Sequence, residues 1–420
     1  MKIALKILNE YEKEKSFVNL LLKDGLKSDL DGRDKGFITE LVYGVVRNKR
    51  FLDHKISNDS KTKVNKLTIP LLNILRMGFY QFYFMDKVPD FAVINESVKL
   101  AEKFCFKSKG MVNAILRKAA ARTAETLPPA IEFSFPDKLY HLIFKQYGEK
   151  TAEILKNLNE KKPVVLRVNT LKISVDEVLK QLTDYSLADD CIILNSVFNP
   201  KENPLFQNGF VSIQSVSSQM AVRVLDPREN ETILDACSAP GGKTVYIAEK
   251  MNNTGELTAC ELHSHRCALI ENNLKRCGIV NCKTVNADVI AFAKECEKNA
   301  VSFNRILIDV PCSGLGVVGG KPDIKWQEFD FEQLISLQRE MLQHCSRILK
   351  TGGTLVYSTC TINQEENIDQ INHFLQQNKN YKPVPFGISI EGTAYGESGT
   401  AQILPGKNSI GFFIAKLQKI

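Results

Sequence analysis

The regular alternation of two kinds of segment after residue 231 constrains the fold more than any other feature of the sequence. Five short segments, at residues 232–237, 255–261, 282–288, 305–310 and 353–358, are candidate strands. Segments with helical spacing separate them, such as 269–277 and 331–349. Strands that alternate with helices are joined by crossovers, so they run parallel. We therefore expect a doubly wound α/β domain that binds its ligands at the carboxyl ends of the strands.

Two cysteines directly follow strands of this predicted sheet. Cys312 comes after Ile306-Leu-Ile-Asp-Val-Pro, and Cys360 comes after Thr354-Leu-Val-Tyr-Ser-Thr. A pair of thiols at the ligand-binding edge suggests covalent catalysis, with one thiol as nucleophile and the other helping to resolve the adduct. Alternatively, both are small buried apolar side chains, as most free cysteines are.

The first predicted strand is followed by Asp235-Ala-Cys-Ser-Ala-Pro-Gly-Gly-Lys-Thr, which opens a helix. The segment is not a phosphate-binding P-loop, because Cys237 stands where the first glycine is required. The dinucleotide fingerprint Gly-x-Gly-x-x-Gly is absent as well. What remains is a tight Pro-Gly-Gly turn. Such a turn lets a ligand approach the backbone and offers it amide groups at a helix N-terminus.

Acidic residues stand at the ends of the next three predicted strands, as Glu261, Asp288 and Asp309. In nucleotide-binding sheets the second-strand acid holds a ribose hydroxyl. The third-strand acid can accept a hydrogen bond from an adenine amino group. A cleft for adenosine without a phosphate cradle fits S-adenosylmethionine. Each acid could instead cap the following helix, but three in series favour the cofactor.

Four motifs together resemble the NOL1/NOP2/Sun family of RNA cytosine-5 methyltransferases. In chain order they are Asp235-Ala-Cys-Ser-Ala-Pro-Gly-Gly-Lys-Thr, Asp309-Val-Pro-Cys-Ser-Gly, Lys321-Pro-Asp-Ile-Lys-Trp and Tyr357-Ser-Thr-Cys-Thr. Upstream, Arg167-Val-Asn-Thr-Leu-Lys resembles the family's approach to its catalytic domain. The basic, helical N-terminus resembles a NusB-like RNA-binding domain. The resemblance therefore covers nearly the whole chain.

This resemblance implies a multidomain protein with three parts. Residues 1–127 would form an all-α NusB-like RNA-binding domain. Residues 128–215 would form a small α+β linker or RNA-binding domain. Residues 216–420 would form an α/β, Rossmann-like class I methyltransferase domain that uses S-adenosylmethionine.

The resemblance also implies the roles of the site residues. Those that would bind the cofactor are Cys237, Ser238, Ala239, Pro240, Gly241, Gly242, Lys243, Glu261, Asp288 and Asp309. Cys360 would be the nucleophile, and its addition to carbon 6 of cytosine would make carbon 5 enamine-like. An acid such as Asp309 would stabilise the adduct by protonation near ring nitrogen 3, with Lys243 close by. Cys312, or a water that it positions, would then remove the carbon 5 proton and so assist release.

The first 125 residues carry the whole positive excess of the chain. They hold 24 Lys and Arg against 15 Asp and Glu, which is +9, and the remaining residues sum to −2, for a total of +7. A polyanion is the expected partner, and nucleic acid is favoured over a membrane because no basic stretch is flanked by exposed Trp, Phe or Leu. The alternative is a merely basic helical domain.

No apolar stretch is long enough to span a membrane. The chain start lacks a secretory signal, and the 11 cysteines contain no Cys-x-x-Cys pair. We therefore expect a reduced, cytoplasmic protein.

A few positions depart from the family pattern or invite another interpretation. Gly319-Gly320 stands where a basic pair is usual, and Ser215 and Ile410 each stand where Asp is common. None of these removes a residue with a chemical role. The dense Cys/His cluster of Cys260, His263, His265 and Cys267 overlaps Glu261, so we interpret it as packing and surface residues and expect no metal site.

The resemblance thus implies an enzyme that methylates carbon 5 of a specific cytosine in 16S ribosomal RNA. We expect a monomer that acts on naked RNA or on an early small-subunit particle. A second interpretation keeps the chemistry but changes the substrate to transfer RNA. A third is a non-catalytic RNA-binding ribosome assembly factor. The joint presence of both cysteines, Lys243 and the three acids argues against the third, and the NusB-like segment favours ribosomal RNA over transfer RNA.

Overall fold

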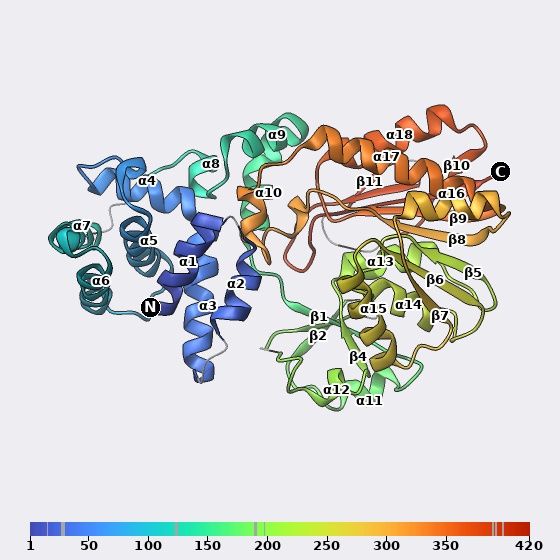
Figure 1. Ribbon diagram of the computed structural model, residues 1–420, viewed down its shortest axis with the longest axis horizontal. Coiled ribbons are helices and arrows are strands. Elements are labelled where there is room, and N and C mark those ends of the chain that lie inside the picture. The colour runs from blue at the N-terminus through green and yellow to red at the C-terminus, as the bar shows by residue number, and fades with distance from the viewer. Residues whose placement is uncertain are drawn as a thin grey trace. The chain divides into compact units, whose positions relative to one another are not determined.

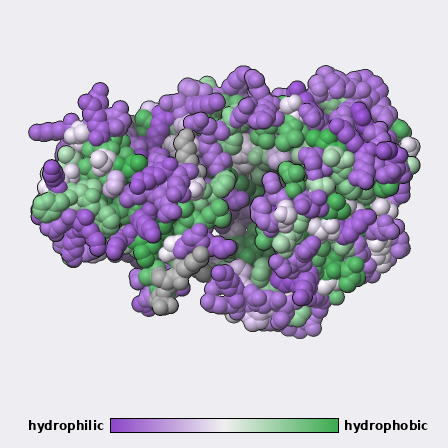
Figure 2. Space-filling view, viewed as in Figure 1, coloured by the Kyte–Doolittle hydropathy of each residue, from purple (hydrophilic) through white to green (hydrophobic). Residues whose placement is uncertain are grey.

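The structure is a computed structural model, in which residues 1–14, 16–26, 30–121, 125–188, 191–196, 198–388, 390, 393–396 and 399–420 are described (Figure 1). The chain folds into two compact units. The first consists of Met1–Asn159 and Gly320–Gln327, and the second of Glu160–Gly319 and Glu328–Ile420. Hydrophilic residues cover most of the face seen in Figure 2. Within the described residues, no helix is long and apolar enough to cross a membrane.

The first unit is helical, as its periodicity predicts. Its helices are α1 (Lys2–Glu14), α2 (Val18–Gly25), α3 (Gly32–Arg47), α4 (Lys49–Asp59), α5 (Ile69–Phe84), α6 (Asp90–Phe104), α7 (Lys109–Ala119), α8 (Pro129–Glu132), α9 (Asp137–Tyr147) and α10 (Thr151–Asn159). Short 3₁₀ turns lie at Val64–Lys66, Phe106–Ser108 and Gly148–Lys150. Helix α5 is buried along nearly its whole length and packs against α1, α3, α4, α6 and α7. Because buried and mostly apolar residues occur around the whole helix, it forms the centre of this unit's core.

A 3₁₀ helix from the C-terminal half of the chain, η5 (Pro322–Trp326), completes the first unit. The Trp326 indole donates a hydrogen bond to the carbonyl oxygen of Val46 at 2.8 Å. The buried Lys325 ammonium donates to Asn159 Oδ1 at 2.9 Å and lies 4.4 Å from the ring centre of Phe135. The Lys-Pro-Asp-Ile-Lys-Trp motif is therefore anchored in the helical core of the first unit.

The second unit begins with a small α+β layer, in agreement with the expectation for this region. Its strands are β1 (Val164–Val168), β2 (Tyr185–Ala188), β3 (Cys191–Leu194) and β4 (Val211–Ile213), in the antiparallel order β2-β3-β1-β4. Two short helices, α11 (Val175–Leu179) and α12 (Pro204–Gln207), accompany them. A capping box formed by Ser174 and Glu177 starts α11.

A nine-stranded mixed sheet forms the rest of this unit. Its strands are β5 (Thr232–Asp235), β6 (Glu256–Glu261), β7 (Cys282–Asn286), β8 (Phe303–Asp309), β9 (Leu349–Thr359), β10 (Tyr381–Pro383), β11 (Thr393–Gly396), β12 (Thr400–Ile403) and β13 (Phe412–Lys419). The order is β11-β12-β13-β9-β8-β5-β6-β7, with β10 beside β13. The five expected strands pair in parallel, which confirms the doubly wound prediction. The antiparallel strands β10 to β13 extend the sheet beyond it.

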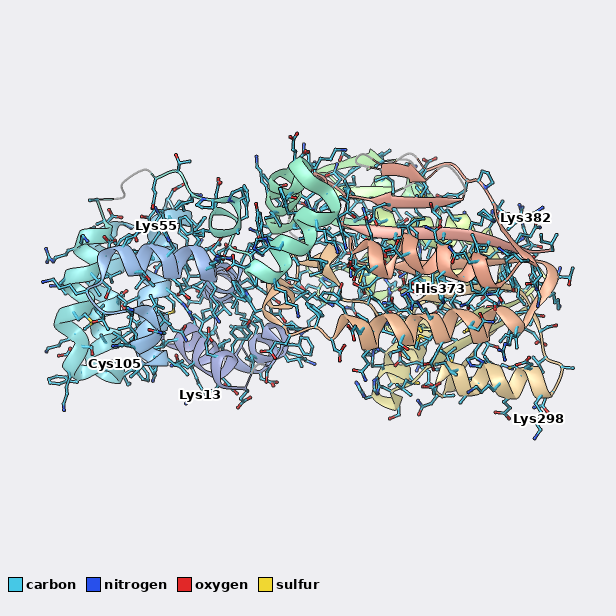
Figure 3. The ribbon with its side chains drawn as sticks, turned by 90° about the horizontal axis from the view of Figure 1, so that it is seen from above. Lys13, Lys55, Cys105, Lys298, His373 and Lys382 are labelled. Carbon is cyan, nitrogen blue, oxygen red and sulfur yellow. The ribbon has the colours of Figure 1, made fainter. Side chains whose placement is uncertain are left out.

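Helices cover both faces of this sheet (Figure 1). Helices α13 (Val216–Leu225), α14 (Gly242–Lys250) and α15 (Ser264–Cys277) share one core with one face. Helices α16 (Val289–Lys298), α17 (Phe331–Arg347) and α18 (Ile368–Gln377) share another core with the opposite face. Figure 3 shows α17 and α18 side by side, with His373 on α18. Leu307 belongs to the first core and Ile306 to the second, because adjacent side chains of a strand point to opposite faces.

Candidate active site

The loop between β5 and α14 carries the predicted cofactor residues Cys237 to Lys243. Ser238 holds the loop against β6, because its backbone N–H and its hydroxyl both donate to the carbonyl oxygen of Cys260, at 3.0 and 3.1 Å. Gly241 has a φ of +101°, and a Cβ at this position would lie 3.1 Å from Ile270 Cα on α15. A glycine is therefore required for the loop to turn so close to α15.

The start of α14 leaves room and hydrogen-bond donors for a ligand. The helix begins at Gly242 without a side-chain cap, so the N–H groups of its first turn are available. A Cβ on Gly242 would meet no atom within 4 Å, so open space lies beside the backbone. These features fit the carboxylate-bearing end of an S-adenosylmethionine molecule.

The small sheet of β1 to β4 holds the end of this loop in place through Arg167. Arg167 on β1 donates one hydrogen bond to the carbonyl oxygen of Gly242 at 2.9 Å and another to Glu249 Oε1 at 2.8 Å. Its guanidinium also lies 4.4 Å from the ring centre of Tyr246. One buried cation thus connects β1 to both ends of α14.

The three predicted acids lie at the carboxyl edge of the sheet but have different surroundings. Glu261 ends β6, is buried, and accepts a hydrogen bond from the backbone N–H of His263 at 3.0 Å. Asp288 is exposed and lies two residues beyond β7, where its Oδ1 caps α16 by accepting from Ile290 N and Ala291 N. The capping alternative therefore holds for one oxygen of Asp288, and its contact with a cofactor stays a prediction.

Asp309, at the end of β8, forms an ion pair with Lys243 from the cofactor loop. The Lys243 ammonium donates to Asp309 Oδ2 at 2.6 Å, and the Ser358 hydroxyl donates to Oδ1 at 2.7 Å. Burial alone would lower the pKa of Lys243, but the attraction of Asp309 outweighs it and raises that pKa. Lys243 therefore remains a cation, held at the sheet edge by a carboxylate that is itself fixed on both oxygens.

The two thiols meet at the same edge. Strands β8 and β9 are paired so that Asp309 lies opposite Ser358. Cys312 and Cys360 follow these two residues closely in the sequence, so both lie just beyond the same edge of the sheet. Their sulfur atoms are 3.3 Å apart. The backbone N–H of Gly316 donates to the carbonyl oxygen of Cys360 at 2.9 Å, which holds the two loops together.

The environments of the two thiols differ. The hydrogen bond to the Cys360 sulfur, followed by burial, raises the pKa of Cys312 well above its ordinary value. The charge of Cys360 is among the influences that raise the pKa of Lys243. A thiolate at Cys360 would therefore be stabilised by both the cation and the Cys312 S–H group.

A groove in the second unit leads to Cys312. Besides this cysteine, its lining residues are Glu328, Phe329, Asp330, Gln333, Leu334, Ser336, Leu337 and Glu340. Cys312 is thus partly exposed as a residue, which excludes its interpretation as a fully buried packing residue.

Three contributors to this edge are not identified by the sequence patterns. They are Asp235 below the loop, Ser358 beside Asp309, and Glu366 beneath the thiols. Asp235 and Ser358 lie inside the quoted motifs, but only their spatial partners distinguish them from ordinary strand residues. In the Cys/His cluster, Cys260 and Cys267 are buried. Within the described residues, no group of three or more His, Cys, Asp or Glu side chains is arranged to hold a metal ion.

Comparisons with protein families agree with this architecture. Residues 222–418 match the model for the 16S rRNA methyltransferase RsmB/F, residues 2–121 match the NusB family, and residues 135–196 match a ferredoxin-like domain of RsmF/B-like methyltransferases. The expected fold class is confirmed, with a NusB-like, a ferredoxin-like and a Rossmann-like part. The exact domain boundaries stay predictions.

Full-length relatives and solved structures are similar as well. A probable ribosomal RNA small subunit methyltransferase B from Bacillus subtilis is 35% identical, covering 99% of this chain and 98% of its own. The ribosomal RNA small subunit methyltransferase B of Shewanella oneidensis is 32% identical, covering 96% and 95%. The crystal structure of PH0851 has a TM-score of 0.81 at 25% identity, covering 99% of this chain and 98% of its own. That of NSun6 from Pyrococcus horikoshii with SFG has a TM-score of 0.60 at 25% identity, covering 68% and 98%. The cofactor of the methyltransferase domain is S-adenosylmethionine.

Proposed function

The chain belongs to the RsmB/F family of 16S rRNA methyltransferases, and on this premise we propose that it methylates carbon 5 of a cytosine in 16S ribosomal RNA through a covalent cysteine adduct. The observation that carries the proposal is the pair of thiols 3.3 Å apart at the ends of β8 and β9, next to the ion pair of Lys243 and Asp309. Neither methylation of a ring nitrogen nor methylation of a ribose hydroxyl needs two thiols at the reacting centre.

The cofactor would supply an electrophilic methyl group at this edge. Residues Cys237 to Lys243 would bind it through the loop backbone, together with Glu261, Asp288 and Asp309. Glu261 is buried at the position where nucleotide-binding sheets hold a ribose hydroxyl. The bracing of Gly242 by Arg167 keeps this loop in place before the cofactor arrives.

Cys360 would act first. Its sulfur would bond to carbon 6 of the cytosine, and the electron pair of the 5,6 double bond would become available at carbon 5 to take the methyl group. The Lys243 ammonium would stabilise the thiolate before attack. The pair of Lys243 and Asp309 would supply the proton that stabilises the adduct near ring nitrogen 3.

Cys312 would complete the reaction. Its pKa is raised chiefly by the hydrogen bond to Cys360. Once the Cys360 sulfur is bound to carbon, this influence weakens, so Cys312 would release its proton to water. The resulting thiolate would then be the base that takes the carbon 5 proton. Removal of that proton restores the double bond, and the bond between the Cys360 sulfur and carbon 6 breaks.

The substrate is proposed from the relatives and from the charge distribution. Full-length similarity to proteins named for the ribosomal small subunit favours 16S RNA over transfer RNA. The excess of +9 in the first 125 residues fits contact with phosphates. We propose a cytoplasmic monomer that acts on naked RNA or on an early small-subunit particle. The intact thiol site argues against a non-catalytic assembly factor.

The test measures methylation and the adduct separately. The protein is incubated with labelled S-adenosylmethionine and either unmodified 16S RNA or transfer RNA, and 5-methylcytosine is mapped. Cys360→Ala should abolish both turnover and adduct, whereas Cys312→Ala should lose turnover yet accumulate a protein–RNA adduct that survives denaturing electrophoresis. Cys105→Ala, a partly buried cysteine of the first unit, is the matched control and should behave like the wild type. Absence of 5-methylcytosine from both RNAs, with folded protein that binds the cofactor, would refute the proposal.

A further inference from the structure

A fully buried carboxylate lies beneath the two thiols without a role in the steps above. Glu366 follows β9 in the 3₁₀ helix η6 (Gln364–Glu366) and has no exposed surface. Four donors converge on its two oxygens: Ser313 N at 2.8 Å, Ser313 Oγ at 2.6 Å, Asn363 Nδ2 at 3.1 Å and Gln338 Nε2 at 3.1 Å. All four contacts are hydrogen-bond donors, two on each oxygen. An ionised carboxylate only accepts hydrogen bonds, so this environment suits it.

These donors belong to the loops that carry the thiols. Ser313 directly follows Cys312, and its hydroxyl lies 2.8 Å from that of Thr361, which directly follows Cys360. Gln338 on α17 donates a second hydrogen bond, at 3.0 Å, to the carbonyl oxygen of Pro311, the residue before Cys312. Glu366 and its donors therefore form a clamp that holds the Cys312 loop on both sides of the cysteine and connects it to the Cys360 loop.

The backbone of Glu366 is fixed as well. Its carbonyl oxygen accepts a hydrogen bond from the buried Tyr357 hydroxyl at 2.7 Å, and Tyr357 lies on β9 three residues before Cys360. The carboxylate is thus attached to the strand that delivers the nucleophile. The backbone of Glu366 is thus bound to β9 and its side chain to the Cys312 loop, so Glu366 fixes the position of this loop relative to β9.

We propose that Glu366 is a positioning residue that sets the separation of the Cys312 and Cys360 sulfurs and keeps Cys312 protonated until the adduct forms. The proposal rests on the proposed function, because it concerns the same two thiols. The part of the proposal that concerns the proton agrees with the electrostatics of Cys312. The pKa of this thiol is raised mainly by the hydrogen bond to Cys360 and by burial, and the negative charge of Glu366 raises it further. Within the described residues, no Lys, Arg or His forms an ion pair with Glu366 to neutralise that charge.

The test compares Glu366→Gln with Glu365→Gln, which removes the same charge one position earlier from a less buried side chain. The amide that Glu366→Gln introduces keeps the size of the side chain but places an N–H₂ group among donors, so the clamp loosens. In the free protein, alkylation of the Cys312 peptide by iodoacetamide at pH 8 is followed by mass spectrometry. We expect about tenfold faster alkylation of Cys312 in Glu366→Gln, because a lower pKa exposes more thiolate. Glu365→Gln should match the wild type.

Turnover provides the second readout. In Glu366→Gln we expect kcat for RNA methylation to fall at least about tenfold, with the Kd for S-adenosylmethionine unchanged, because the cofactor loop is not part of the clamp. A merely structural loss would change the cofactor affinity and the melting temperature together. If Glu366→Gln does not fold, Ser313→Ala removes only the two hydrogen bonds of the Ser313 hydroxyl and should show the same changes in the same direction, at smaller size.

An unchanged alkylation rate of Cys312 and an unchanged kcat in folded Glu366→Gln, or in folded Ser313→Ala, would overturn the proposal. The alkylation experiment needs no RNA, so it tests the clamp even if the wild-type protein labels neither RNA. In that case the proposed function fails while the positioning of the thiols is still decided by the alkylation rates.

Discussion

The buried carboxyl group of Asp235 makes the catalytic sheet sensitive to pH, and Asp235→Asn is expected to remove this sensitivity. Asp235 ends β5 with no exposed surface and accepts a hydrogen bond from Thr244 at 2.7 Å. Burial raises its pKa from 3.8 to about 7, although the hydrogen bond from Thr244 acts in the opposite direction. The folded protein therefore retains a proton that the unfolded chain has already released. This contribution to stability is fully present below pH 3.8 and is lost as the pH rises through 7.

The size of the effect follows from the two pKa values. At about 1.4 kcal/mol for each pKa unit, the interval corresponds to about 4 kcal/mol of unfolding free energy. On the order of 2 kcal/mol of it is lost between about pH 5 and pH 7, where few carboxylates titrate. In Asp235→Asn the side-chain oxygen still accepts from Thr244, and no proton is gained or released.

Hydrogen exchange of the β5 amides measures this directly, because β5 pairs with both β6 and β8 at the centre of the sheet. Tryptophan fluorescence is unsuitable, since the single tryptophan, Trp326, belongs to the other unit. After correction for intrinsic exchange, the opening free energy of the wild type relative to the variant should fall by about 2 kcal/mol from about pH 5 to pH 7, or roughly thirtyfold in exchange rate. A difference that stays constant over this range would show that Asp235 is ionised throughout and would refute the reasoning.

Three further predictions follow from the contacts. Peroxide should oxidise Cys312 and Cys360 to a disulfide, because their sulfurs are 3.3 Å apart; the titratable thiols should fall by two from the 11 of the reduced chain, and methylation should stop until dithiothreitol restores it. An unchanged thiol count contradicts this. Lys243→Met should lower turnover by about 100-fold, because Asp309 loses its cation, whereas Lys250→Met at the exposed end of α14 should not, as measured in the methylation assay. Trp326→Phe should lower the unfolding free energy of the first unit by about 1 kcal/mol, because the hydrogen bond to Val46 is lost; urea titration followed by circular dichroism checks this.

The parallel part of the sheet could be predicted because its signal is local. Most strands from β5 to β9 contain a short apolar run, and segments with helical spacing lie between them. Both the crossovers and the edge that carries Cys312 and Cys360 therefore follow from the pattern. Strands β10 to β12 have no such signal, and the apolar run of β13 has no helical segment between it and β12 to indicate a crossover. Strands β10 to β13 pair antiparallel with β9 and with one another at the end of the sheet, and their register depends on tertiary contacts.

The location of the Lys-Pro-Asp-Ile-Lys-Trp motif could not be predicted for a different reason. In the sequence it follows the Cys312 loop closely, which groups it with the catalytic residues. Its apolar and cationic side chains instead pack into the helical core of the first unit, around Trp326 and Lys325. Hydrophobic periodicity indicates that a segment is buried, but it does not indicate in which core.

The different tasks that we propose for the two thiols rest on their neighbours rather than on their positions on the sheet. Both cysteines follow parallel strands, and by sequence alone either could attack. Lys243 stabilises negative charge at Cys360, whereas the Glu366 carboxylate opposes negative charge at Cys312. The sulfurs are 3.3 Å apart, so one thiol can donate a hydrogen bond to the other sulfur as a thiolate. The arrangement therefore favours a thiolate at Cys360 and a thiol at Cys312. In the proposed mechanism, the bond between Cys360 and carbon 6 would remove the charge that held the proton on Cys312. Cys312 would then release this proton to water, and its thiolate would accept the carbon 5 proton.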